Sequence, residues 1–341
     1  MHSKENGRDV GDFTVRRPRA AGCVQRLIAV SVLCLAHRGG AALRPENTLC
    51  AFENAIALGA DGAELDVQLT REGHVVVFHD FRLNPDFCRG AGGAWVVAPG
   101  PAIAQLQLEE IESFDVGRAR PGSAYARAHP ELSGSDGERI PLLAEVIELA
   151  RRGPKPFRLF IELKTSLADP SLSAPPETLA DSVTALLKQT DYFDRSVLVG
   201  FDWRALVRAK AIEPRCICWF STRPESWFGD GDPPAEDDSP PGPALQIFRH
   251  WARTGTSPWA TGFDRIKFGG SILAAIKAAG GNGWFPWWRD ASAGSVAEAH
   301  GLGMAVGAWT VNDPGDMRTL ARRGIDAICT DRPHVMIPAL A

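Results

Sequence analysis

Ionisable side chains stand at the ends of four apolar, strand-like runs of this chain. They are His37 and Arg38, Glu64 and Asp66, His79, and Glu162 and Lys164. Two histidines can accept and donate protons near neutral pH, and two cations suit a phosphate group. Side chains of these types, brought together, predict acid/base cleavage of a phosphodiester.

Three carboxylates in this set predict a metal site. Glu64 and Asp66 lie two positions apart in one run, so both side chains point to the same side of a strand. Together with Glu162 they would repel one another, and burying them is costly unless a cation lies between them. All-oxygen ligation favours a hard cation, Mg²⁺ or Ca²⁺, over zinc. Such an ion would neutralise a phosphate and orient the attacking group.

The elements that must position these residues follow an α/β pattern. Apolar runs rich in Val, Ile and Leu alternate with amphipathic segments, as in a parallel sheet covered by helices. We expect strands at 28–36, 62–68, 75–79, 158–163, 196–201, 215–220, 304–311 and 325–329. We expect helices at 48–59, 142–152, 177–189, 203–211, 270–279, 293–301 and 314–323. The pattern predicts a TIM-type (β/α)₈ barrel, whose active site lies at the carboxyl ends of its strands.

Two features complicate this ring. Residues 283–286 are a competing strand, and the step from Asp66 to Val75 is too short for a helical crossover, so we expect an irregular ring there. Two long segments rich in Gly, Pro and polar residues also interrupt the pattern. They are 81–140, an insertion or cap between strands 3 and 4, and 221–262, a long surface loop.

Composition limits the class of protein. The chain has 341 residues, 45% of them hydrophobic, which is enough for one large barrel. A net charge of −4 gives no broad basic surface, so nucleic acid is not an expected partner. Seven cysteines without paired spacing do not predict a disulfide framework. No apolar stretch reaches the roughly 20 residues that a membrane span needs.

The N-terminal region allows two interpretations. Arginines followed by the apolar run 27–36 imitate a signal peptide, and export to the periplasm or medium would follow if residues 1–36 were one. We prefer the first barrel strand, because the run leads directly into His37. On this interpretation residues 1–26 are a disordered extension, residues 27–341 are the barrel domain, and the protein is cytoplasmic.

Five motifs in order carry a family resemblance. They are His37-Arg38-Gly39-Gly40, Pro45-Glu46-Asn47-Thr48, Glu64-Leu65-Asp66-Val67, His79-Asp80 and Glu162-Leu163-Lys164. With the closing segments 309–312 and 324–333, they resemble the glycerophosphodiester phosphodiesterase family over about 35–335. The chain departs from that family at Glu72-Gly73, where Asp-Gly is usual, and at Gly200-Phe201, where Ser-Phe is common.

The resemblance implies a TIM-type barrel that hydrolyses glycerophosphodiesters to glycerol 3-phosphate and an alcohol. His37 and His79 match the family's catalytic pair, and the segment after His79 matches its characteristic insertion. The family's metal ligands match Glu64, Asp66 and Glu162.

Four residues are expected to contact the substrate, and the sequence leaves a second interpretation open for two of them. Arg38 and Lys164 supply positive charge for the phosphate. Glu46 either touches metal or substrate or belongs to a loop that closes into a helix N-cap, and we treat Asn47 as structural. Trp309 either packs over a glycerol moiety or fills the barrel mouth.

Other functions remain open at this point. A phospholipase D-like enzyme acting on lysophospholipid or sphingomyelin would use a similar site. A barrel without catalysis could serve as a binding module, although both histidines and all three carboxylates are present. A sugar isomerase or aldolase would not explain the segment 45–48 or His79-Asp80. The preferred alcohol, the attacking group and the oligomeric state are not determined by the sequence.

Overall fold

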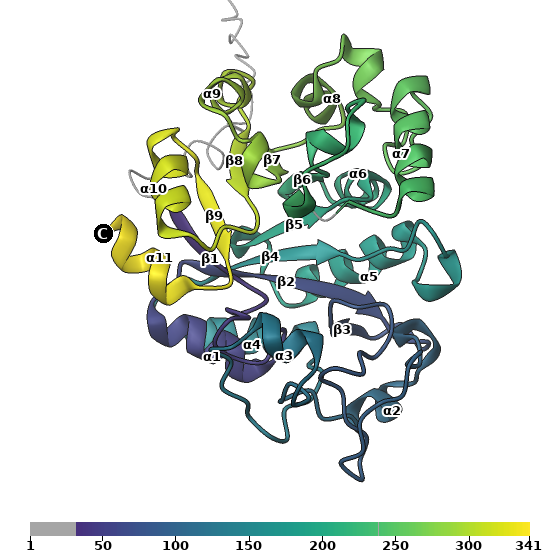
Figure 1. Ribbon diagram of the computed structural model, residues 1–341, viewed down its shortest axis with the longest axis vertical. Helices are drawn as coiled ribbons and strands as arrows, with labels where there is room; N and C mark the ends of the chain where they lie inside the picture. The colour runs from purple at the N-terminus through teal and green to yellow at the C-terminus, as the bar shows by residue number, and fades with distance from the viewer. Residues whose placement is uncertain (1–31, 238) are drawn as a thin grey trace, which may run out of the picture. The chain divides into compact units, whose positions relative to one another are not determined.

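Eight parallel strands form a closed ring in the computed structural model, which describes residues 32–237 and 239–341. The strands are β1 (Leu33–His37), β2 (Gly62–Leu69), β4 (Arg158–Leu163), β5 (Ser196–Gly200), β6 (Cys218–Thr222), β7 (Gly283–Pro286), β8 (Ala305–Ala308) and β9 (Ala327–Thr330). Each pairs with the next, and β1 pairs with both β2 and β9, which closes the ring (Figure 1). The predicted TIM-type barrel is therefore confirmed. Residues 28–31 of the expected first strand lie outside the described residues.

One expected strand does not belong to the ring. β3 (Val75–Val77) runs antiparallel to β2, with Val67 opposite Val77. The chain turns back at Thr70–Gly73, where Gly73 has a φ of 90°. This turn leaves no room for the crossover that a parallel return requires. β2 therefore pairs directly with β4, and the eighth ring strand is 283–286, between β6 and β8. The insertion follows β3, between β3 and β4.

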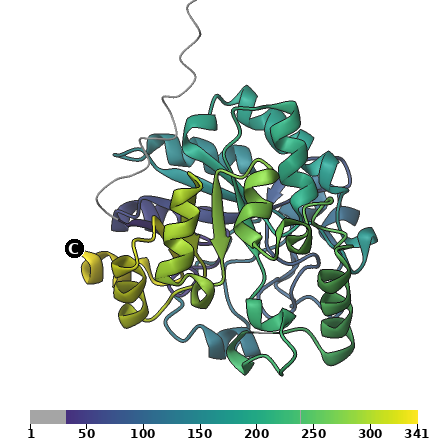
Figure 2. The same cartoon turned by 90° about the horizontal axis from the view of Figure 1, so that it is seen from above.

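Helices cover the outside of the ring (Figure 2). They are α1 (Leu49–Leu58), α4 (Leu143–Arg152), α5 (Pro176–Gln189), α6 (Trp203–Ile212), α8 (Ile272–Ala278), α9 (Ala293–Gly301), α10 (Pro314–Arg322) and α11 (Pro333–Leu340). All seven helices predicted from the sequence are among them. The Thr48 side chain accepts a hydrogen bond from Ala51 N at the start of α1, and Gly59 ends the helix with a φ of 85°. None of the helices in the described part of the chain is long and apolar enough to cross a membrane.

The inside of the ring is a packed core. Its buried side chains are Leu33, Leu35, Phe160, Val197, Val199, Trp219, Phe285, Ala327 and Cys329. Trp219 is the largest of them, and glycines on β7 and β8 make room for its ring. A Cβ at Gly283 would lie 2.5 Å from the Trp219 ring, and one at Gly307 2.9 Å. Only the carboxyl-terminal mouth of the barrel is left for polar side chains.

Both long segments contain regular structure. The insertion holds α2 (Leu108–Glu112), α3 (Ala124–Ala128) and a small core of its own beside β3 (Figure 1). The segment 221–262, expected as a loop, contains α7 (Gly242–Thr254) and the short turn of helix η5 (Glu225–Phe228). Pro243 in the first turn of α7 and Gly255 at its end, with a φ of 67°, fix its limits.

Candidate active site

His37 lies at the carboxyl end of β1 and is held by the neighbouring strand. Its Nδ1 is 2.6 Å from Asp331 Oδ1, and its Nε2 is 3.8 Å from Glu64 Oε2. Asp331 follows β9, and Asn312 donates a hydrogen bond of 2.6 Å to its other oxygen. Burial alone would lower the pKa of His37, but the charge and hydrogen bond of Asp331, together with the Glu64 charge, outweigh burial and the Arg38 charge and raise that pKa. Burial would raise the pKa of Asp331, yet His37 and Asn312 lower it to about 2.

The three predicted metal ligands meet at one point. Glu64 and Asp66 project from β2, and Glu162 on β4 lies opposite Asp66 in the strand register. One oxygen from each carboxylate lies within 4.8 Å of those from the other two. Glu64 is 3% exposed and Asp66 is 1% exposed, so water can screen their charges only weakly.

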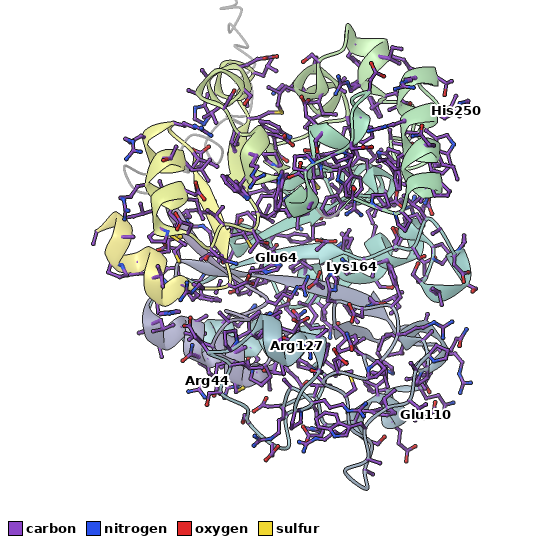
Figure 3. All side chains as sticks on the ribbon, viewed as in Figure 1. Arg44, Glu64, Glu110, Arg127, Lys164 and His250 are labelled. Atoms are coloured by element: carbon purple, nitrogen blue, oxygen red, sulfur yellow. The ribbon has the colours of Figure 1, made fainter. Side chains whose placement is uncertain are left out.

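Two cations lie against these carboxylates. Lys164 Nζ is 2.9 Å from Glu162 Oε1 and 3.5 Å from Asp66 Oδ1. The Arg38 Nη1 donates to Glu46 Oε1 at 2.9 Å, and its Nε is 3.4 Å from Asp66. Figure 3 shows Glu64, on β2, near Lys164, which directly follows β4, whereas His250 lies away from them on α7.

The backbone after β1 is bent to bring Arg38 into place. Arg38 has a left-handed φ of 50° and Asn47 one of 57°. Asn47 N donates to Arg38 O at 2.8 Å, and Asn47 Nδ2 donates to Asp66 Oδ2 at 2.9 Å. Asn47, which we treated as structural from the sequence, therefore contacts one of the clustered carboxylates as well as the loop.

The charges of the clustered carboxylates and of the side chains around them favour binding of a divalent cation. Four carboxylates (Glu46, Glu64, Asp66 and Glu162) share two permanent cations, Arg38 and Lys164, because the nearby histidines each pair with a further carboxylate, Asp331 or Asp80. Burial and the Asp66 charge raise the pKa of Glu64 to about 8. Burial would also raise the pKa of Asp66, but His79, Lys164 and Arg38 lower it. The group therefore carries an excess of negative charge, and its donors are all carboxylate oxygens.

His79 follows β3, and the β2–β3 hairpin brings it near Asp66. Phe78 N donates to Asp66 O at 2.9 Å, which sets the turn that follows β3. Gln68 Nε2 donates to the carbonyl oxygens of Phe78 and Asp80, both at 2.8 Å, and fixes the backbone on either side of His79. His79 Nδ1 is 2.7 Å from Asp80 Oδ1. Burial would raise the pKa of Asp80, but its hydrogen bond with His79 lowers it.

Glu46 makes hydrogen bonds to residues of the site, whereas Trp309 packs against aromatic residues at the barrel mouth. Glu46 pairs with Arg38 and accepts a hydrogen bond of 2.8 Å from the Tyr125 hydroxyl, which the insertion supplies. Trp309 follows β8, donates from Nε1 to Phe285 O at 3.0 Å, and packs edge-on against Phe201 with 5.3 Å between ring centroids. Its ring partners are Phe201 and Trp287, and none of its hydrogen bonds within the described residues goes to the clustered carboxylates.

The sequence reasoning assigned no role to Asp331, Asn312 or Tyr125. Asp331 had a usable signal, because it is an acidic residue two positions after the predicted strand 325–329, much as Glu162 lies at the end of another. Tyr125 had none, since its contact with Glu46 spans 79 positions.

A closed parallel barrel with ionisable residues at the carboxyl ends of β1, β2 and β4 has the architecture of the TIM-barrel enzymes. The chain also matches the family model described as "Glycerophosphoryl diester phosphodiesterase family" over residues 37–335. It therefore belongs to that family and is an enzyme of this class, as the resemblance implied.

Relatives with similar sequences or folds agree with this membership. A glycerophosphodiester phosphodiesterase from Caldanaerobacter subterraneus is 27% identical, over 90% of this chain and 97% of its own. A solved structure from Silicibacter pomeroyi, described as a candidate glycerophosphoryl diester phosphodiesterase, is 28% identical with a TM-score of 0.74, covering 92% of this chain and 94% of its own. A phosphodiesterase from Oleispira antarctica, solved with the product sn-glycerol-3-phosphate, shares the fold at 21% identity, a TM-score of 0.61 and coverage of 91% and 96%.

Proposed function

We propose that this enzyme hydrolyses glycerophosphodiesters to glycerol 3-phosphate and an alcohol, using a divalent cation and two proton-transferring histidines. One observation carries the proposal: the barrel mouth joins His37 and three clustered carboxylates, and the β2–β3 hairpin brings His79 beside them. Family membership and the product found in the Oleispira antarctica relative support the choice of substrate.

Glu64, Asp66 and Glu162 are the residues that would hold Mg²⁺ or Ca²⁺. Their all-oxygen donor set, the excess of negative charge and the raised pKa of Glu64 support this assignment. A bound divalent cation would neutralise phosphate oxygens and polarise the phosphorus centre. Arg38 and Lys164 add two positive charges beside the same point and are proposed to bind the remaining phosphate oxygens.

Both histidines are prepared for proton transfer in the same way. The Nδ1 of His37 is engaged by Asp331 and the Nδ1 of His79 by Asp80, so Nε2 is the nitrogen left for substrate in each ring. We assign one histidine to accept the proton of the attacking group, which is the glycerol 2-hydroxyl or a water molecule. The other donates a proton to the alcohol oxygen as its bond to phosphorus breaks, so the alcohol leaves neutral.

Glu46 and Trp309 are proposed to orient the rest of the substrate. Glu46 holds Arg38 in the direction of the phosphate and is itself fixed by Tyr125. Trp309 presents a half-buried ring at the mouth and suits the carbon face of a glycerol moiety.

Product analysis tests this function. Phosphorus NMR of a reaction with glycerophosphocholine and Mg²⁺ or Ca²⁺ should show glycerol 3-phosphate, with choline released in equal amount. Choline phosphate as the product would place cleavage on the wrong side of phosphorus. Binding of the diester without any turnover would instead support a barrel that acts as a binding module.

A further inference from the structure

A cavity of about 280 Å³ lies on the carboxyl-terminal face of the barrel, the face that also carries the clustered carboxylates. It lies at the carboxyl ends of β4, β5 and β6. Two of its wall residues adjoin the site in sequence: Thr165 follows Lys164, and Phe81 follows Asp80. Its volume is close to the lower end of the roughly 300–1,000 Å³ typical of ligand sites. The cavity and the clustered carboxylates are therefore neighbours on one face of the barrel, although no clustered carboxylate lines the cavity.

The cavity wall is mainly apolar and rich in aromatic rings. Its rings include Phe81, Phe201, Phe228, Phe248, Trp259 and Phe263. Most of these six rings belong to the segment after β6. In this segment η5, α7 and the turns that follow cover the cavity. An apolar wall of this kind stabilises a hydrocarbon by removing it from water.

The carboxylates in the wall already have partners. Asp202 accepts hydrogen bonds from Thr165 at 2.8 Å and from Arg204 at 2.7 Å. The others are Asp264, which accepts from Ser257 N and lies 3.6 Å from Lys267 Nζ, and Glu225, which is 3.3 Å from Arg265. These pairings disfavour a cationic head group as the occupant.

The rings of the cavity wall already contact other side chains, which disfavours a cage for a quaternary ammonium group. The Arg223 guanidinium lies 3.9 Å from the centroid of the Phe201 ring, so a cation already covers this aromatic face. Phe248 and Trp259 pack on each other with 5.3 Å between centroids. Both observations favour an uncharged chain over a second cation.

Hydrogen bonds hold the segment that covers the cavity to itself and to the barrel. Asp237 accepts hydrogen bonds from Ser226 Oγ at 2.5 Å and from Trp287 Nε1, after β7, at 3.1 Å. Arg249, a buried residue of α7, donates to Trp227 O at 2.8 Å. The cavity is therefore formed before a ligand arrives, which lowers the entropy cost of binding.

We propose that this cavity binds a hydrocarbon chain carried by the phosphodiester substrate, so that the enzyme prefers diesters with an apolar arm. The proposal rests on the function proposed above and specifies its substrate class. The chain can be attached at either end of the diester, as an alkyl group on the leaving alcohol or as an acyl group on the glycerol.

Two substrate series distinguish these sources. The first is glycerophosphoalkanols from ethyl to decyl, which release glycerol 3-phosphate and an alkanol. The second is 1-acyl lysophosphatidylcholines from butanoyl to decanoyl, which release a lysophosphatidic acid and choline. Each buried methylene should raise kcat/KM about threefold to fourfold, in one series or the other, until the cavity is full.

A cavity-filling variant completes the test. Ala252 of α7 lines the cavity and is half-buried, so Ala252→Phe places a ring inside it. Ala244→Phe makes the same change on the same helix at a half-buried position outside the lining and is the matched control. Ala252→Phe should lower kcat/KM at least tenfold for the longest chains and leave glycerophosphoethanolamine within twofold. Ala244→Phe should change neither.

Each outcome of this test decides one of the two proposals. A rise with chain length that Ala252→Phe abolishes supports the cavity assignment, and the responding series identifies where the chain is attached. Flat kinetics in both series, with glycerophosphoethanolamine still hydrolysed, overturns the cavity assignment and leaves the proposed function intact. Equal losses in both variants also overturn it. Failure to cleave any diester rejects the proposed function itself.

Discussion

Replacing Asp331 by Asn removes one negative charge beside His37 and keeps the size of the side chain. In the native enzyme Asp331 Oδ1 lies 2.6 Å from His37 Nδ1, and its charge and hydrogen bond, with the Glu64 charge, outweigh the effects of burial and of Arg38 on the ring. In Asp331→Asn, burial and Arg38 would still lower the pKa of His37 while Glu64 alone would oppose them, so that pKa should fall. Asp331 is thus a positioning residue whose effect reaches the substrate through His37.

The size of the effect follows from this contact. A hydrogen bond between charged groups contributes about 1.5–3 kcal/mol. We therefore expect kcat/KM to fall on the order of 10- to 100-fold.

The free energy of unfolding should change as well. The folded pKa of Asp331, about 2, is below its ordinary 3.8. This difference corresponds to about 2 kcal/mol of stability that is present above pH 4 and is lost as the pH falls through 2.

The assay is the pH dependence of kcat/KM for glycerophosphocholine, followed by release of glycerol 3-phosphate. The limb that belongs to His37 should move to lower pH in Asp331→Asn. Asp326→Asn is the matched control, because Asp326 also pairs with a histidine, His300 at 2.9 Å, at the opposite end of β9. If the variant loses stability without any shift of that limb, or if Asp326→Asn shows the same loss of activity, our reasoning about Asp331 is wrong.

Other perturbations test the remaining roles. His37→Ala and His79→Ala should each lower kcat on the order of 10²–10⁴-fold. Their unfolding temperatures should stay near that of the native enzyme, because both histidines lie at the barrel mouth. Near-normal turnover in a steady-state assay would show that the replaced histidine does not transfer a proton. Glu64→Gln should weaken Mg²⁺ or Ca²⁺ binding more than about tenfold in titration calorimetry, and unchanged affinity would exclude Glu64 as a ligand. Intact mass of the protein from its native source should show that the residues before His37 are retained, because removal of 33–36 would take away the strand that pairs with β2 and β9. A mature chain that begins at His37 would instead indicate export and overturn the proposed cytoplasmic location.

The apolar pattern predicted most of the barrel because parallel strands are buried on both faces. It misplaced 75–79, since three consecutive valines look the same in a parallel ring strand and in the second arm of a hairpin. The short turn at 70–73 was the feature that decided between them. The helix α7 was missed because segments rich in Pro, Gly and Asp precede it and hid its amphipathic pattern.

The candidate site could be predicted in part because strand ends meet at one mouth. Glu64, Asp66 and Glu162 come from adjacent strands, so their clustering follows from the order of the ring. Contacts made across the closed ring or from the insertion had no comparable signal. The pairing of His37 with Asp331 spans 294 positions. The aromatic cavity is formed by segments following β3, β4, β5 and β6, and no local pattern in the sequence joins them.

Metal removal and replacement tests the central claim most directly. The enzyme is dialysed against a chelator, its residual metal is measured by mass spectrometry, and glycerol 3-phosphate release from glycerophosphocholine is followed while Mg²⁺ or Ca²⁺ is added back. We predict that the metal-free enzyme is inactive and that one of these ions restores turnover in the native protein but restores less at the same concentration in Glu64→Gln. Full turnover by native enzyme that contains no detectable metal would contradict the account.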